Sequence, residues 1–288
     1  MREITLEELL EAGCHFGHQV NRRNPKADEF IFEERSNIHI INLEKTHEGL
    51  IKAAEFLRDL ASRDGYLVVV GTKRQARGLV LEEVQRARKE GAKGIFYVTS
   101  RWVGGTLTNF HEVSKNFKKL LNLRKFLESS EKENYTKREI VLFEKEKNKL
   151  EGFYGGIVDM DKIPDALYII DTKLEDTAVK EAKALGVKTV GIVDTNSDPS
   201  VVSYPVPAND DAVGSIKIIT SYLVDAWIEG SKSPKPSLEK TEEKKEKAEK
   251  AKSKVSEEKK TEKTENKKEE KTRPQKKPSS KKAETKSK

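Results

Sequence analysis

Apolar positions in the C-terminal half of the chain switch between short continuous runs and helically spaced stretches. Ala166 to Ile170 and Thr189 to Val193 are apolar, β-branched runs, and an Asp-Thr pair follows each of them. Between them, Asp176 to Leu185 carries Ala and Leu at helical spacing, and Gly186 follows. This order predicts a strand, a crossover helix and a second, parallel strand.

The same alternation of strand and helix signals fills the N-terminal half. Short apolar runs predict three more strands, at Ile38 to Ile41, Tyr66 to Val70 and Ile95 to Val98. Helical spacing predicts helices over Leu43 to Ser62 and over the stretch after Gly71-Thr72. A last extended run, Val201 to Pro207, precedes Asn209-Asp210-Asp211, which we expect to cap a helix reaching Trp227. Five or six strands of this kind predict a flavodoxin-like, doubly wound α/β fold.

From Phe110 the alternation stops, and apolar residues step by three and four along two consecutive stretches. The two stretches meet at a polar turn from Ser129 to Tyr135. This pattern predicts an antiparallel coiled-coil helical hairpin inserted into the α/β domain. Arg124 and Lys147 fall in its seam.

At the N-terminus, Thr5 and Glu8 have the spacing of a capping box, and Gly13 is placed to end the short helix that they begin. The segment from Cys14 to Glu34 shows no periodicity. We therefore expect a long loop there.

Composition separates the end of the chain from the rest. Charged residues make up 36% of the 288 residues and apolar residues 35%, which is too polar for one uniform globule. Ser231 to Lys288 holds 22 Lys and Arg, 12 Glu and no aromatic residue, so we expect a disordered tail. The tail accounts for the basic pI of 9.1, and the residues before it are slightly acidic. A solvated tail and non-specific attraction to polyanions are both open.

These patterns divide the chain into an α/β domain in two parts (1–107 and 155–230), the inserted hairpin (108–154) and the tail (231–288). One cysteine, Cys14, excludes an internal disulfide and suits a reducing compartment. No segment has the pattern of a signal peptide or the roughly 18 apolar residues of a membrane span. We expect a soluble, cytoplasmic protein with no membrane partner.

The loops after the predicted strands lack the motifs of common α/β enzymes. GTKRQARG, after Val70, has neither GxGxxG spacing nor a GK[ST] ending. No GxSxG elbow occurs, and the two His-Glu pairs lack the second His of a zinc protease. Cys14, His15 and His18 fall short of the four ligands of a closed zinc site, and the alternative is a loop packed on the domain.

Four aspartates lie in two loops that could converge at one edge of the sheet: Asp194, Asp198, Asp210 and Asp211. Their carboxylates would suit a hard cation such as Mg²⁺. Turn and helix-cap chemistry is the alternative, because Asp and Asn bond nearby backbone amides. We predict no cofactor beyond this candidate ion.

Basic residues follow two of the predicted strands. Lys73, Arg74 and Arg77 lie in the first turn of a helix, where the helix dipole is already positive, so an anion is expected beside them. Arg101-Trp102 follows the next strand and pairs a donor fork with an aromatic plane, although Trp102 could equally belong to the core. Together with the basic residues Arg22, Arg23 and Lys26, they predict an anion-binding patch that would fit structured RNA.

The segments AGCHFGHQ, FIFEERSNIHIINLEKT, VVGTKR, RWVGGTLTN, GGIVDMDKIPDALYIID, GIVDTNSDP and PANDDA resemble the bacterial form of small-subunit ribosomal protein two. The resemblance runs in consistent order from about Glu7 to Glu229. It implies a structural protein without catalytic residues that contacts small-subunit rRNA and neighbouring ribosomal proteins. It also implies docking of the large ribosomal protein one near the mRNA exit site. The chain departs from the family at Arg23, where an aromatic residue is common, and at Ala27-Asp28-Glu29, where Met-Lys-Pro is common.

We therefore predict a ribosomal structural protein, with no small-molecule substrate, that binds rRNA through basic and neighbouring residues: Arg22, Arg23, Lys26, Lys73, Arg74, Arg77, Arg101, Trp102 and Asn109. The hairpin and the acidic faces would be left for protein neighbours. One alternative is a flavodoxin-like enzyme that binds a nucleotide at its strand ends. The other is a free nucleic-acid binder that relies on the tail.

Overall fold

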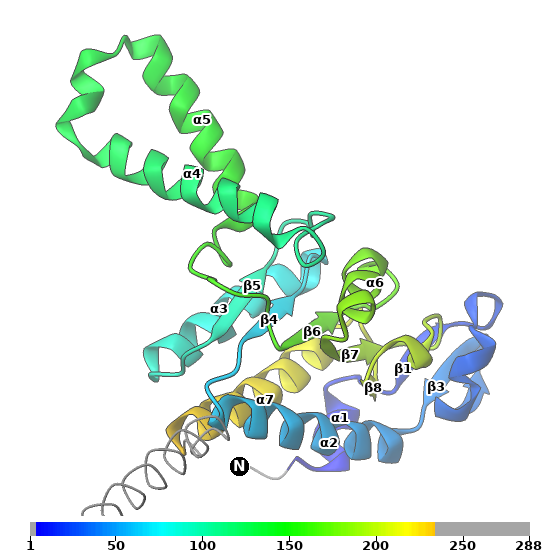
Figure 1. Cartoon of the computed structure of the whole chain (residues 1–288). Helices are drawn as coiled ribbons and strands as arrows, with labels where there is room; N and C mark the ends of the chain where they lie inside the picture. The colour runs from blue at the N-terminus through cyan, green and yellow to red at the C-terminus, as the bar shows by residue number, and fades with distance from the viewer. Residues whose placement is uncertain (1–3, 234–288) are drawn as a thin grey trace, which may run out of the picture. The chain divides into compact units, whose positions relative to one another are not determined.

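The centre of the fold is a sheet of five parallel strands, seen in a computed structural model that describes residues 4–233 (Figure 1). The strands are β4 (Leu67–Val70), β5 (Ile95–Val98), β6 (Ala166–Ile170), β7 (Lys188–Val193) and β8 (Tyr204–Pro207). Their order across the sheet is β5-β4-β6-β7-β8. Counted within this sheet alone, that is 2-1-3-4-5, the flavodoxin-like order, so the predicted fold class is confirmed.

Alternate residues of the strands enter two separate cores. Val69, Tyr168 and Ile192 face the core shared with α2 (Leu43–Ser62), α3 (Arg74–Lys89) and α7 (Val213–Lys232). Val70, Leu167 and Ile169 face the core shared with α6 (Asp176–Leu185) and the base of the hairpin. Helices on both faces explain why every residue of β4 and β6 is buried.

Helices α2 and α7 run side by side beneath the sheet (Figure 1). Trp227, at the end of the predicted last helix, is fully buried, and its Nε1 donates a hydrogen bond to the carbonyl oxygen of Lys93 at 3.0 Å. A Cβ on Gly230 would lie 2.2 Å from the carbonyl oxygen of Arg58. Glycine there lets the two helices approach closely.

The predicted hairpin is present. It consists of α4 (Phe110–Glu128), a 3₁₀ turn η3 (Ser130–Asn134) and α5 (Lys137–Tyr154), and it extends away from the sheet in Figure 1. Arg124 lies in the seam as expected, and its Nε donates to Glu151 Oε2 at 3.0 Å. Near the turn, the rings of Phe126, Tyr135 and Phe143 contact one another edge to face.

The N-terminal region confirms one prediction and contradicts another. The helix α1 (Leu6–Glu11) has the expected Thr5–Glu8 capping box, but the segment from Cys14 to Glu34 is not a long loop. It contains β1 (Phe16–Gln19), the 3₁₀ helices η1 (Val20–Arg22) and η2 (Pro25–Phe30), and most of β2 (Ile31–Arg35). These strands are short and mostly exposed, so no apolar alternation marks them.

The strand β3 (Ile38–Ile41) was predicted correctly, but its assignment to the parallel sheet was wrong. It pairs antiparallel with both β1 and β2 in a separate three-stranded sheet. The extended run predicted from Val201 is also shorter, because the 3₁₀ helix η4 (Pro199–Val201) comes before β8. None of the helices within residues 4–233 has the length and apolar character needed to cross a bilayer. Almost all of the predicted tail lies outside these residues.

Candidate nucleic-acid interface

The loops that follow the five parallel strands all lie at the carboxyl edge of the sheet. Because β4 and β5 are adjacent, the start of α3 lies beside the loop after β5. Arg77 Nε donates to the carbonyl oxygen of Thr72 at 2.8 Å, and its Nη2 lies 3.5 Å from that of Ser100. The structure thus brings together the two basic segments that the sequence placed at neighbouring strand ends.

Lys73 lies at the centre of this edge and is surrounded by carboxylates. Its Nζ is 2.9 Å from Asp171 Oδ2, 2.6 Å from Asp210 Oδ1 and 2.8 Å from Asp211 Oδ1. Only 14% of its side chain is exposed. Burial by itself lowers the pKa of Lys73, but the carboxylates outweigh burial and raise it. The anion that the sequence predicted beside this cation is therefore supplied by the protein itself.

A histidine from β1 reaches the same acidic cluster. His18 Nδ1 lies 3.0 Å from Asp194 Oδ2, and this contact, opposed by burial, raises the pKa of His18. Asp210 is fully buried, and its Oδ2 has no hydrogen-bond partner within the described residues. Burial raises the pKa of Asp210 to about 7, and Asp171 and Asp194 add to this while Lys73 opposes it.

The ligand atoms of His18, Asp194 and Asp210 all lie within 4.8 Å of one another. A cation between them would give Asp210 Oδ2 the partner it lacks. The sequence suggested Mg²⁺ from the aspartates alone, whereas the imidazole nitrogen in this donor set favours Zn²⁺. The sequence did not group His18 with these aspartates, because the contact of β1 with the loop after β7, where the His18 amide donates to Thr195 Oγ1 at 3.0 Å, cannot be inferred from spacing.

Other polar residues of this region hold local turns. Asn209 Oδ1 accepts hydrogen bonds from the amides of Asp211 and Ala212 at 2.8 and 3.0 Å, in the turn that precedes α7. The N-cap residue of α7 is Ala212, and no side chain caps the helix, so the predicted cap from Asn209-Asp210-Asp211 is wrong. Asp198 Oδ1 accepts from the amide of Ser200 at 2.9 Å. Cys14 is buried away from solvent, and burial raises the pKa of its thiol to about 11.

The predicted basic segment from Arg22 to Lys26 packs on the β7 side of the same edge. The amide of Asn24 donates to the carbonyl oxygen of Thr195 at 2.8 Å, and Lys26 Nζ lies 2.6 Å from Asp198 Oδ2. Arg23 Nη2 lies 2.9 Å from Asp28 Oδ2. The two departures from the family pattern at positions 23 and 28 thus pair with each other, and Arg22 stays exposed beside them.

Trp102 is buried, which fits core packing rather than base stacking, and its Nε1 donates to Glu181 Oε1 at 3.2 Å. Glu181, which the sequence did not single out, also accepts from the amides of Gly105, Leu107 and Thr108 at 2.7, 2.9 and 3.2 Å. Burial opposes ionisation of Glu181, but these donors lower its pKa. Glu181 therefore fixes the loop between Arg101 and the hairpin; Asn109 lies exposed at the start of α4.

Charge changes sign along the carboxyl edge. Arg74, Arg77 and Arg101 are exposed over β4 and β5, whereas carboxylates gather over β6, β7 and β8. Between β4 and β6, where flavodoxin-like proteins bind ligands, Lys73 pairs with Asp171 and the hydroxyl of Thr72 donates to Glu175. This switch point is filled by the protein's own side chains and offers no phosphate cradle.

The hairpin, which we predicted to contact protein neighbours, carries an excess of basic residues. Helices α4 and α5 together hold ten Lys and Arg against six Glu. Because the residues before the tail are slightly acidic as a whole, the hairpin is a locally basic part of the described chain.

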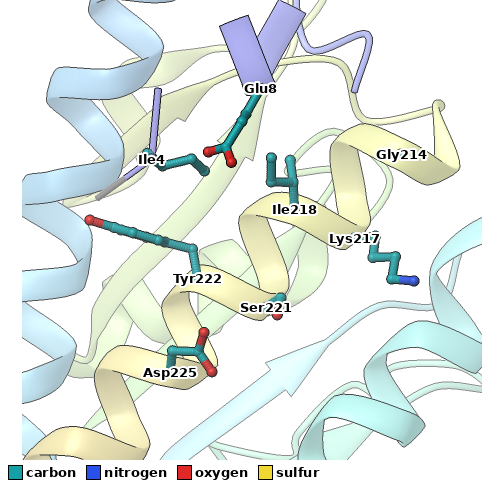
Figure 2. Close-up of a pocket in the computed structure, with 8 residues that line it drawn as sticks. All are labelled: Ile4, Glu8, Gly214, Lys217, Ile218, Ser221, Tyr222 and Asp225. Carbon is teal, nitrogen blue, oxygen red and sulfur yellow. The ribbon is translucent and has the colours of Figure 1, made fainter. Parts of the chain in front are cut away.

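A separate cavity of about 250 Å³ lies between α1 and α7, and none of the basic residues of the candidate interface lines it (Figure 2). Ile4, Ile218 and Tyr222 line it, and Glu8 points into it from α1. Figure 2 shows Lys217 extending away from Glu8. The cavity has no cluster of cations and is not part of the candidate interface.

A comparison with family models supports the resemblance noted in the sequence. The model described as Ribosomal protein S2 matches residues 9–230, which is more than half of the chain. The match covers both parts of the α/β domain and the hairpin between them. Members are structural, non-enzymatic proteins of the small ribosomal subunit, so the nucleotide-binding enzyme is excluded. The chain belongs to the ribosomal protein S2 family and acts in translation as a component of the ribosome.

Proposed function

We propose that the chain binds small-subunit rRNA chiefly through Arg74, Arg77 and Arg101. All three are exposed at one end of the sheet, and within residues 4–233 none of them has a carboxylate at ion-pair distance. Arginine at the start of a helix is unfavourable unless an anion docks, and its planar fork matches phosphate. The observation that carries the proposal is that these arginines are exposed and have no carboxylate partner among the described residues.

The remaining predicted residues contribute in other ways. Lys73, Arg23 and Lys26 already have carboxylate partners, so a phosphate would have to displace those partners. We propose that they hold the loops at the carboxyl edge of the sheet in place and contribute to its electrostatic field. Arg22 and Asn109 are exposed and available for direct contact.

Co-sedimentation of the full chain with small subunits lacking this protein, in rising salt, tests the proposal. Replacing Arg74, Arg77 and Arg101 by Gln together is expected to weaken association and to reduce the slope of log K against log salt by about 2–3, since each phosphate contact contributes ~0.7–0.9. A control of equal charge change replaces Lys52 and Arg58 on α2, and Arg63 just after it, by Gln; each of these residues already has a carboxylate partner. Equal slopes for both triple variants and the wild type would refute the assignment.

We also propose that ribosomal protein one docks on the exposed face of the three-stranded sheet. Phe32, Phe16 and Ile38 are 69%, 48% and 37% exposed. Phe16 lies opposite Ile40, two residues from Ile38, so the side chains of Phe16 and Ile38 share a face. Phe32 belongs to β2 on the other side of β3, at the irregularity in the pairing of these two strands. An exposed apolar patch of this kind suits a protein partner.

A pull-down with purified ribosomal protein one tests this docking surface. Phe16→Ser and Phe32→Ser are expected to reduce capture by the full chain. Leu142→Ser, which removes an exposed apolar side chain from the hairpin, is the control and is expected to leave capture unchanged. Undiminished capture by the Phe16 and Phe32 variants would place the docking surface elsewhere.

A further inference from the structure

A cavity of about 350 Å³ lies between the loop after β5 and the base of the hairpin. Arg101 and Trp102 line it from the loop, and Asn116 and Phe153 line it from α4 and α5. Its size falls within the range of about 300–1,000 Å³ that is usual for small-ligand sites. The cavity is therefore large enough to receive one planar group.

The walls of the cavity carry positive charge. Arg101 and Lys149 are exposed at its rim, and its lining among the described residues contains no Asp or Glu. Arg77 approaches from the side, because its guanidinium lies 3.5 Å from the carbonyl oxygen of Ser100, next to Arg101. A ligand that carries negative charge at the rim would be favoured there.

The interior of the cavity suits an aromatic ring. Phe153 and Leu150 are half-buried and present apolar surface, and Trp102 also lines the cavity. Asn116 adds an amide that can both donate and accept hydrogen bonds. A ligand with a negatively charged group at the rim and a flat, hydrogen-bonding ring inside the cavity matches one unstacked nucleotide of RNA.

The loop that forms this wall is held in place independently of any ligand. Glu181 accepts hydrogen bonds from Trp102 Nε1 and from the amide of Gly105, so the loop on both sides of the cavity wall is anchored to α6. The opposite wall is the last turn of α5, where a Cβ on Gly152 would lie 3.8 Å from Ser100 Oγ. The cavity is thus formed by two fixed elements and is preorganised for binding.

We propose that this cavity binds a single unpaired nucleotide of RNA, with its base against Phe153 and its phosphate between Arg101 and Lys149. The inference rests on the proposed rRNA-binding function and deepens it, because it names the form of RNA recognised. A base-paired helix would supply phosphates to Arg101 but could not insert a base.

Photocrosslinking of the full chain to a short oligouridine containing 4-thiouridine tests the proposal, with mass spectrometry of the crosslinked peptides. Crosslinks are expected within residues 101–104 or 149–154. Phe153→Leu is expected to weaken binding about fivefold or more, because it removes the stacking ring but keeps apolar packing. Lys149→Gln, at an exposed position, is expected to reduce the slope of log K against log salt by about 0.7.

Phe126→Leu is the matched control, since it removes a ring from the same hairpin near its turn. Crosslinks found only outside the two cavity segments, or equal affinities for Phe153→Leu and Phe126→Leu, would overturn the inference. Co-sedimentation of the wild type with small subunits separates this failure from that of the proposed function. If the wild type co-sediments through its three arginines without cavity crosslinks, rRNA binding stands and the nucleotide site falls.

Discussion

Replacing Glu181 by Gln is expected to loosen the loop that joins the sheet to the hairpin. The Glu181 carboxylate accepts hydrogen bonds from the ring nitrogen of Trp102 and from the amides of Gly105, Leu107 and Thr108. It is 8% exposed, so water cannot readily replace it. Glutamine keeps the shape and one acceptor oxygen, but it places an amide NH₂ where a carboxylate oxygen now meets N–H groups.

The magnitude follows from these contacts. A hydrogen bond to a charged group contributes ~1.5–3 kcal/mol, against ~0.5–1.5 kcal/mol for a neutral one, and each buried donor left without a partner costs ~1–3 kcal/mol. Because the donors share one acceptor group, the losses do not add in full. We expect Glu181→Gln to lower the free energy of unfolding by about 2–4 kcal/mol, which is roughly 4–16 °C in melting temperature for a domain of this size.

The effect also depends on pH. The N–H donors lower the pKa of Glu181 in the folded protein, so its ionisation stabilises the fold fully above the unfolded pKa of about 4.3. That contribution is lost as the pH falls through the folded pKa. The difference in unfolding free energy between wild type and Glu181→Gln is therefore expected to be full at neutral pH and to shrink below about pH 4.

Urea unfolding followed by circular dichroism measures the stability, and hydrogen exchange at residues 105, 107 and 108 reports the loop directly. Glu82→Gln on the exposed face of α3 is the control, and it is expected to change the free energy of unfolding by no more than about 0.5 kcal/mol. A Glu181→Gln effect as small as that of the control, or unchanged exchange at these amides, would refute the role assigned to Glu181.

Three further changes test other parts of the structure. Lys73→Met is expected to lower the free energy of unfolding by about 3–5 kcal/mol, since it leaves Asp210 buried without its cation; a loss below about 1 kcal/mol in urea unfolding would contradict this. Gly156→Ala should destabilise, because its Cβ would lie 2.1 Å from the carbonyl oxygen of Tyr97, whereas Gly78→Ala in open space on α3 should stabilise by up to ~1 kcal/mol; thermal melting checks the opposite signs. Zn²⁺ at a hundredfold excess over Kd should raise the melting temperature by about 5 °C or more in the wild type and not in Asp210→Asn; equal responses would exclude the site.

Local signals in the sequence were enough to predict most of the elements. Apolar runs located the five strands of the parallel sheet, and the helix from Leu43 to Ser62 was predicted with the bounds that the structure has. Gly186 adopts the left-handed conformation expected after a helix, and Thr5 and Glu8 form their capping box. Such features depend on neighbours in the chain, so they can be recognised without knowledge of the tertiary structure.

Contacts between distant segments were not predictable in the same way. β3 has the residues of a buried strand, and only its pairing with β1 and β2 shows that it belongs to a separate sheet. The anchoring of the Arg101 loop by Glu181 joins residues more than seventy positions apart in sequence. Nothing next to Glu181 in the sequence distinguishes it from other glutamates in helices, because its role depends on a loop that is distant in the chain.

The start of α3 shows why such contacts decide function. The helix dipole disfavours a cation at Lys73 and at Arg74 alike, so the sequence argument that each needs an anion applies to both. Lys73, the residue before the first helical residue, turns to the carboxylates of Asp210 and Asp211, whereas Arg74 stays exposed. Buried ion pairs are screened by salt much less than exposed charges. The contribution of Lys73 to folding stability should therefore persist at high salt, whereas the contribution of Arg74 to RNA affinity should fall as salt rises. Arg74, and not Lys73, is thus the residue whose substitution tests recognition of RNA.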